Sequence, residues 1–281
     1  MELINLKEKG LPKNRFDMFL DTFQMSWNSL VYISLFLGLF ALPAILVIVF
    51  SQMTGINILT NVDSSNSEAI MSATIKYYYH NISTIFYLIP CFVILSFGFA
   101  GCFNIMKKIV WLEKVDFFDN FKQGIKGNIW KILFNSLLIT IIYAIGCLTY
   151  LYILFNKTTP LVVVLSICFS IILMILLVNI LFCGYSQMVI YKNNLFSYIK
   201  NCVICSNISF GKNILIILLS FVLVPIGFLF EGVVGVVIVF SFYLLIGFGY
   251  AILLVTLNYH RIFDKAINKA NYPSIYRKGL S

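Results

Sequence analysis

Charged residues are scarce in this chain. Only 11% of its 281 residues are Asp, Glu, Lys or Arg, whereas 60% are hydrophobic. A soluble domain carries about 25% charged residues, so the polar side chains here are too few to cover a globule in water. The mean hydropathy of +0.95 indicates that a lipid bilayer is the solvent.

The sequence contains long runs of apolar residues. A helix needs about 20 consecutive apolar residues to cross a bilayer, and six runs come close to that length or exceed it. Lipid offers no partner to unpaired backbone groups, and the runs lack the alternation of barrel strands, so each should be a helix. The sequence predicts an all-α polytopic transmembrane helical bundle with spans near residues 29–50, 82–103, 132–155, 161–191, 214–230 and 233–259.

Positive charge is almost missing from one side of this predicted bundle. Eighteen of the 20 Lys and Arg residues fall in segments 1–28, 104–131, 192–213 and 260–281, which lie on a single side when the spans alternate. Loops rich in Lys and Arg stay in the cytoplasm. We therefore expect a multi-pass protein of the cell (cytoplasmic) membrane with both termini in the cytoplasm. It would have an N-terminal segment 1–28, a six-helix domain 29–259 and a basic tail 260–281.

The net charge of +9 indicates what this basic side contacts. Lys and Arg beside membrane spans are attracted to anionic lipid headgroups, so we expect the lipid bilayer to be the main partner there. Nucleic acid is not expected as a partner, because no connection is long enough to form a soluble module with a binding groove.

Residues 116–131, DFFDNFKQGIKGNIWK, are half polar in a mostly apolar chain. On a helical wheel the apolar side chains gather on one face and most charged ones on the other. With Asp116 as the N-cap, the stretch predicts an amphipathic helix that lies in the cytoplasmic interface with its apolar face toward lipid. We expect it to dock another membrane complex through Phe117, Phe118, Phe121, Lys122 and Lys126.

Two other stretches, 16–27 and 195–203, also place apolar side chains on one face directly before a span. One explanation is a threefold repeat, in which an interfacial helix precedes each pair of spans. The other is that straps before a span look alike because they all lie in the same interface.

Ionisable residues are missing from the middle of every predicted span. A proton-coupled carrier or an intramembrane protease needs at least one buried ionisable group, so neither is expected. Asn179 and Gln187 are polar residues of the fourth span and share a rough face, because they are eight positions apart. They form either hydrogen bonds between helices or polar contacts to a ligand.

Cofactor and metal motifs are also missing. The seven cysteines offer no disulfide framework, and free cysteines in a span pack as small hydrophobes. Cys202-x-x-Cys205 is the only metal-like spacing, and it lacks a second pair of zinc ligands unless two chains share the ion. The sequence contains neither a glycine-rich phosphate loop nor a catalytic triad. We therefore expect no enzymatic activity, no cofactor and no metal.

Residues 101–133 read GCFNIMKKIVWLEKVDFFDNFKQGIKGNIWKIL. This run resembles the YesL family of bacterial membrane proteins, in which a basic segment and a D-F-x-x-x-F-K-x-x-x-x-x-N stretch lead into a span. The run SWNSLVYISLFLGLFALP, 26–43, is similar to the first helix of that family. The resemblance covers most of the chain. It implies a bacterial protein found near sugar-uptake transporters, with no established activity. The matching positions are Asp116, Phe117, Phe121, Lys122 and Asn128.

The sequence therefore favours a non-enzymatic integral membrane protein that acts as an accessory or partner of a membrane complex, such as a solute (sugar) transporter. The alternative is a transporter or lipid-handling protein in its own right, with a cavity near Asn179 and Gln187. A polar cavity that holds a titratable group would instead favour an enzyme.

Overall fold

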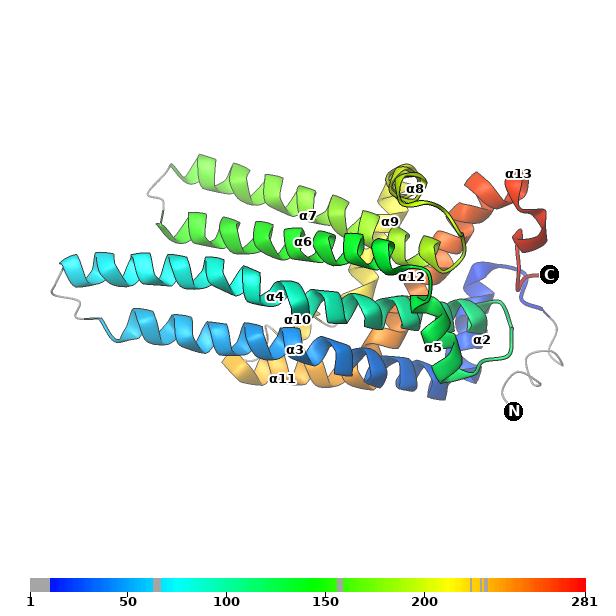
Figure 1. Ribbon diagram of the computed structural model, residues 1–281, viewed down its shortest axis with the longest axis horizontal. Coiled ribbons are helices and arrows are strands. Elements are labelled where there is room, and N and C mark those ends of the chain that lie inside the picture. Colours follow the sequence, from blue (N-terminus) through cyan, green and yellow to red (C-terminus); the bar gives the residue numbers. More distant parts are fainter. Residues whose placement is uncertain (1–10, 63–66, 156–158, 223, 228, 230–231) are drawn as a thin grey trace. The chain divides into compact units, whose positions relative to one another are not determined.

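The computed structural model describes residues 11–62, 67–155, 159–222, 224–227, 229 and 232–281 (Figure 1). Every regular element in these ranges is helical, which confirms the predicted all-α fold. Part of the predicted N-terminal segment, residues 1–10, lies outside the described residues. So do most of the short connection 156–160 and residue 231.

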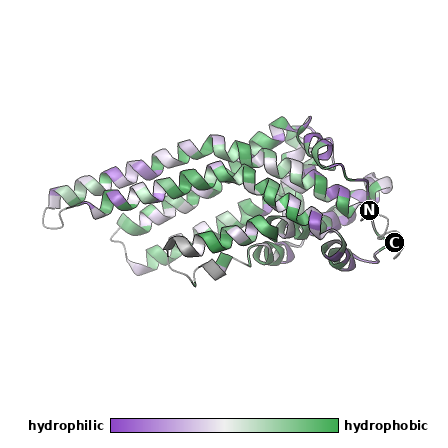
Figure 2. Cartoon of the chain, turned by 90° about the horizontal axis from the view of Figure 1, so that it is seen from below, coloured by the Kyte–Doolittle hydropathy of each residue, from purple (hydrophilic) through white to green (hydrophobic). Residues whose placement is uncertain are grey.

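Five segments of the described chain are long and apolar enough to cross a membrane. They are α3 (Trp27–Thr60), α4 (Ser67–Val110), α6 (Ile129–Phe155), α7 (Pro160–Met188) and Val237–Asn271. A sixth span results if α8 (Leu195–Asn207) and α9 (Phe210–Ser220), which are bent by 91°, are taken together. Hydrophobic residues cover most of the length of these helices (Figure 2). The chain is a membrane-embedded helical protein.

The last of these segments contains several elements. It begins within α11 (Gly232–Phe242) and continues through a π-helical turn, η1 (Tyr243–Gly247), into α12 (Phe248–Phe263). A second π-helical turn, η2 (Asp264–Asn268), and α13 (Lys269–Asn271) complete it. The helical segment thus continues twelve residues beyond 259, the predicted end of the sixth span.

The predicted spans 29–50 and 82–103 leave residues 51–81 as a connecting loop, and this prediction is wrong for most of that stretch. Apart from a short connection, α3 and α4 continue through it as helices. The Ser51 hydroxyl lies 3.1 Å from His80 Nε2 and 2.6 Å from Thr84 Oγ1, so polar side chains pair the two helices. A polar composition does not end a helix when its side chains find partners on the neighbouring helix.

The predicted fifth span, 214–230, is not one helix. α9 ends at Ser220, where the Phe221 amide turns back to carbonyl groups of the last helical turn. A four-residue helix follows, α10 (Val224–Gly227). Pro225 lies in its first turn, and a proline has no N–H to continue the hydrogen-bond ladder of α9.

The chain folds into two compact units, which are described separately here. Unit 1 comprises residues 1–40, 97–132 and 179–281, and unit 2 comprises 41–96 and 133–178. The core of unit 2 is built around Leu88, Cys91 and Phe92 of α4, with Ala44 of α3 and Tyr143 of α6 packed against them. Unit 1 contains all three stretches that were predicted as interfacial helices.

Each of those stretches forms a short helix directly before a longer one. They are α2 (Arg15–Met25), α5 (Phe117–Ile125) and α8. Two long helices follow α2 and two follow α5, whereas α8 is followed by α9, the short α10 and the segment that begins with α11. The first two stretches therefore have the order that the predicted threefold repeat requires.

Helices of unit 1 approach one another closely at positions where one of them carries a glycine. The Gly249 amide of α12 donates a hydrogen bond of 2.8 Å to the Ser34 hydroxyl of α3. A Cβ at position 249 would collide with the Leu30 carbonyl. Small residues allow this kind of contact between backbones in membrane helices.

Candidate functional site

α5 is the helix that the sequence predicts as a docking element. Its N-cap is Asp116, as predicted, and the carboxylate accepts a hydrogen bond of 3.5 Å from the Asp119 amide. The helix ends after Ile125, and Gly127 follows with a φ of +80°, in the left-handed region that glycine adopts without strain. The sequence thus encodes both ends of this nine-residue helix.

The inner face of α5 is anchored within unit 1. The Phe121 ring is buried, with its centroid 4.8 Å from that of Phe36 and 5.4 Å from that of Phe40. A Cβ at Gly101 would overlap this ring, and a Cβ at Gly124 would lie 2.5 Å from the Ala100 carbonyl oxygen. The prediction that Phe121 docks a partner is wrong, because its ring belongs to the core of this chain.

The outer face of α5 carries the remaining predicted residues. Phe118 is 64% exposed, and Lys122 and Lys126 are exposed as well. Phe117 is half-buried, and its ring packs edge-on against Phe36 at a centroid distance of 5.3 Å. We call Phe118, Lys122 and Lys126 the α5 outer face.

Asn179 joins three helices of unit 1. Its Nδ2 donates to the Ser206 carbonyl of α8 at 2.7 Å, and the Tyr259 hydroxyl of α12 donates to the oxygen atoms of Asn179. Asn213 of α9 also donates to the Ser206 carbonyl, at 2.8 Å. Of the two predicted roles, these contacts favour hydrogen bonding between helices.

Gln187 is fully buried two turns further along α7. Its Oε1 accepts a hydrogen bond of 3.3 Å from the Cys202 thiol. Its Nε2 has no hydrogen-bond partner among the described residues. Cys202 and Cys205 are both buried, and no His, Cys, Asp or Glu cluster suited to a metal ion occurs in the described part of the chain.

Two lysines that the sequence assigns to the headgroup layer bind inside the protein instead. Lys107 Nζ donates to the Val189 carbonyl at 2.8 Å, and Lys131 Nζ donates to the Tyr191 carbonyl at 3.2 Å. Both carbonyl groups follow the end of α7. Cations stabilise such groups, because the C-terminal end of a helix carries partial negative charge.

Sequence reasoning missed a buried carboxylate. Asp264 Oδ2 lies 2.8 Å from Arg15 Nη2, and its Oδ1 accepts hydrogen bonds from Asn268 Nδ2 at 2.9 Å and the Arg277 amide at 3.2 Å. These contacts explain why residues 260–271 are helical rather than part of a tail. The one available signal was that Asp264 is the only acidic residue after Glu231.

Glu113 ties the C-terminal segment to the connection after α4. Its carboxylate contacts Lys278 Nζ at 2.5 Å and Lys108 Nζ at 2.9 Å. Burial by itself raises the pKa of Glu113, but hydrogen bonds from the two ammonium groups outweigh it and lower the pKa below its usual value. Lys278 also lies over the Trp111 ring, 4.4 Å from its centroid.

His260 is buried next to Trp111, and the centroids of the two rings are 5.9 Å apart. Neither ring nitrogen has a hydrogen-bond partner among the described residues. The sequence predicts an absence of ionisable residues only for the middle of the spans, and it does not indicate that His260, at the end of α12, and Asp264, at the start of η2, are both buried.

The arrangement is that of a hydrogen-bonded helix junction beside an exposed aromatic and basic helix face. The Asp264 carboxylate is held by Arg15 and the Asn179 amide by Ser206 and Tyr259, so both groups hold helices together. Comparison of the chain with protein-family models, with curated proteins and with solved structures finds no significant match.

Proposed function

We propose that the chain is a non-enzymatic multi-pass membrane protein that acts as an accessory subunit of another membrane complex, such as a solute transporter. The observation that carries this proposal is the α5 outer face. Phe118 is 64% exposed beside two exposed lysines, while Phe121 of the same helix is locked in the core.

A fixed helix is well suited to docking. A nine-residue helix is not stable alone in water, so the contacts of Phe121 and Gly124 keep α5 folded. A surface that is already ordered loses little conformational entropy on binding. Aromatic residues are enriched at protein interfaces, and Lys122 and Lys126 favour a partner with an acidic surface.

The distribution of Lys and Arg supports a topology in which α5 and both termini face the cytoplasm. The partner surface would then be cytoplasmic or lie in the inner interface of a bacterial membrane. The resemblance of residues 101–133 to the YesL family supports a partner among sugar-uptake transporters.

The alternative, a transporter with a cavity at Asn179 and Gln187, has less support. Both residues are buried, and the Asn179 side chain already hydrogen-bonds α8 and α12. A substrate would have to displace these hydrogen bonds before it could bind.

The test is affinity purification from native membranes in mild detergent, with quantitative mass spectrometry. We expect a stoichiometric transporter subunit with the wild-type protein and at least a tenfold loss of it with Phe118→Asp. Phe196→Asp is the matched control, because Phe196 is a 79% exposed aromatic residue on another short helix, α8. Phe121→Asp is unsuitable, because a charge at this buried position would disturb the fold.

Two results would contradict the proposal. One is a partner that Phe118→Asp retains as well as the wild-type protein does. The other is a wild-type protein that purifies without any stoichiometric partner, which would favour the transporter alternative.

A further inference from the structure

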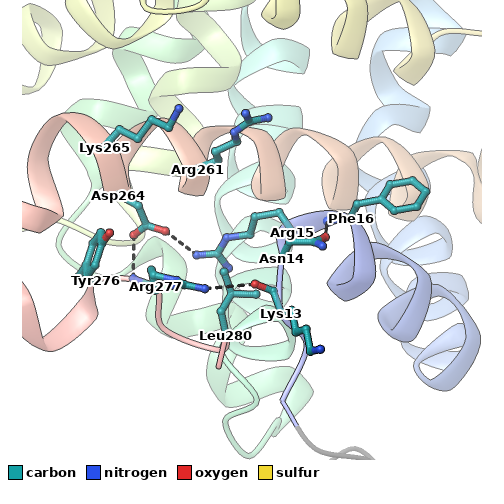
Figure 3. A pocket seen from close by; sticks show the side chains of 10 residues that line it. All are labelled: Lys13, Asn14, Arg15, Phe16, Arg261, Asp264, Lys265, Tyr276, Arg277 and Leu280. Carbon is teal, nitrogen blue, oxygen red and sulfur yellow. Dashed lines mark hydrogen bonds and ion pairs between the residues drawn. The ribbon is translucent and has the colours of Figure 1, made fainter.

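A cavity of about 530 Å³ lies in unit 1 between the segment before α2, the end of α12 and the C-terminal segment (Figure 3). Its volume falls within the range of about 300–1,000 Å³ that is typical of small-molecule sites. Among the residues that the structure describes, Asp264 is the only acidic one that lines it. Its cationic lining residues are Lys13, Arg15, Arg261, Lys265 and Arg277. We call it the basic pocket.

The positive charge of this pocket is only partly balanced. The Asp264 carboxylate pairs with the Arg15 guanidinium at 2.8 Å. The side chains of Lys13, Arg261 and Lys265 make no ion pair within the described part of the chain. Cations held close together repel one another unless an anion binds between them.

The geometry of the cations suits a phosphate group. Arg261 and Lys265 are four residues apart and so lie on the same side of the helix, and Figure 3 shows them next to each other. Arg277 lies on the other side of this helix, with Asp264, and its Nη2 donates to the Lys13 carbonyl at 3.2 Å (Figure 3). A guanidinium and an ammonium group next to each other are suited to binding phosphate oxygens.

Apolar residues at the same pocket indicate where the anion comes from. Phe16 lines it and is 68% exposed, and Leu280 lines it as well. The candidate span Val237–Asn271 ends beside it, and α3, another candidate span, begins at Trp27, two residues after α2. The ends of spans lie at the level of the lipid headgroups, and basic pockets between such helices bind anionic headgroups.

We propose that the basic pocket binds the phosphate group of an anionic phospholipid, with Arg261 and Lys265 as its hydrogen-bond donors and Phe16 against the apolar part of the lipid. This site is independent of the accessory role of α5, because the two use different residues. A soluble phosphate ester offers the same phosphate chemistry without the acyl chains.

The experiment uses the purified full-length protein in a neutral detergent. Short-chain phosphatidylglycerol, short-chain phosphatidylcholine and glycerol 3-phosphate are titrated separately, and binding is followed by thermophoresis. We expect saturable binding of phosphatidylglycerol, at least tenfold tighter than that of phosphatidylcholine. Glycerol 3-phosphate should bind more weakly than phosphatidylglycerol. Equal binding of these two anions would keep the phosphate site but reject the lipid as its source.

The decisive variant is Arg261→Gln combined with Lys265→Gln. Each charge-assisted hydrogen bond contributes about tenfold to affinity, so the pair should weaken phosphatidylglycerol binding by about a hundredfold. Both side chains are exposed, so the thermal unfolding midpoint should not change. Lys269→Gln with Lys200→Gln is the control, since it removes two exposed lysines outside the pocket. The proposal fails if the wild-type protein does not bind either anion, or if test and control variants bind phosphatidylglycerol equally well.

Discussion

Replacing Phe121 by Ala tests whether α5 is anchored in the protein or rests on lipid. The Phe121 ring packs against Phe36 and Phe40 of α3 and lies over Gly101 of α4. Removing it leaves a void between three helices, which α5 can fill only by moving. Phe118, three residues earlier on the same helix, is 64% exposed and serves as an internal control.

The expected cost follows from these contacts. Truncating a buried Phe to Ala costs about 3–5 kcal/mol, of which each aromatic pair contributes roughly 0.5–1.5 kcal/mol beyond its buried area. With two ring pairs lost, we expect Phe121→Ala to lower the free energy of unfolding by about 3 kcal/mol or more. At about 2–4 °C per kcal/mol for a chain of this size, the unfolding midpoint should fall by roughly 6–12 °C.

The assay is thermal unfolding of both variants in the same detergent, followed by circular dichroism. Phe118→Ala should shift the midpoint by no more than about 2 °C, since exposed substitutions usually change stability by less than 0.5 kcal/mol. Equal shifts for Phe121→Ala and Phe118→Ala would refute the assignment of Phe121 to the core. A larger shift for Phe118→Ala would reverse the orientation of α5.

Two further predictions concern polar contacts. Asn179→Leu should lower the free energy of unfolding by about 1–3 kcal/mol, because the buried hydrogen bonds of the Asn179 side chain with the Ser206 carbonyl and the Tyr259 hydroxyl are lost. An unchanged midpoint would contradict the role of Asn179 in joining helices. The pKa of Glu113 is lowered by its two paired lysines against the opposing effect of burial. Its ion pairs therefore stabilise the fold above the pKa of the unfolded carboxyl group, and this contribution is lost as the pH falls through the folded-state pKa. Between about pH 7 and pH 3 the unfolding midpoint should fall more steeply for the wild-type protein than for Glu113→Gln. If the midpoints of the two proteins fall in parallel with pH, the ion pairs of Glu113 do not stabilise the fold.

The sequence predicted those features that depend on local chemistry. Apolar runs such as 132–155 can only be helices in lipid, and α6 (Ile129–Phe155) matches that run within three residues. The Asp116 cap and the turn at Gly127 also come from neighbouring residues, so both ends of α5 followed from the sequence.

Features that depend on distant partners could not be predicted. A helical wheel shows that Phe118 and Phe121 lie near one face, but not which of them meets another helix. Asp264 looked like a surface residue of a basic tail, because its partner Arg15 is 249 positions away in the sequence. Ser51 looked like part of a loop, because its hydrogen-bond partner His80 lies on another helix.

The ion pair between Arg15 and Asp264 has a consequence for the order in which the protein is made. The ribosome synthesises Arg15 249 residues before Asp264, a delay of roughly 12–50 s at about 5–20 residues per second. During that time α2 has no Asp264 to bind, although the long apolar helices after it have already been made. Helix α2 therefore leaves the ribosome long before the carboxylate that binds its Arg15 has been made.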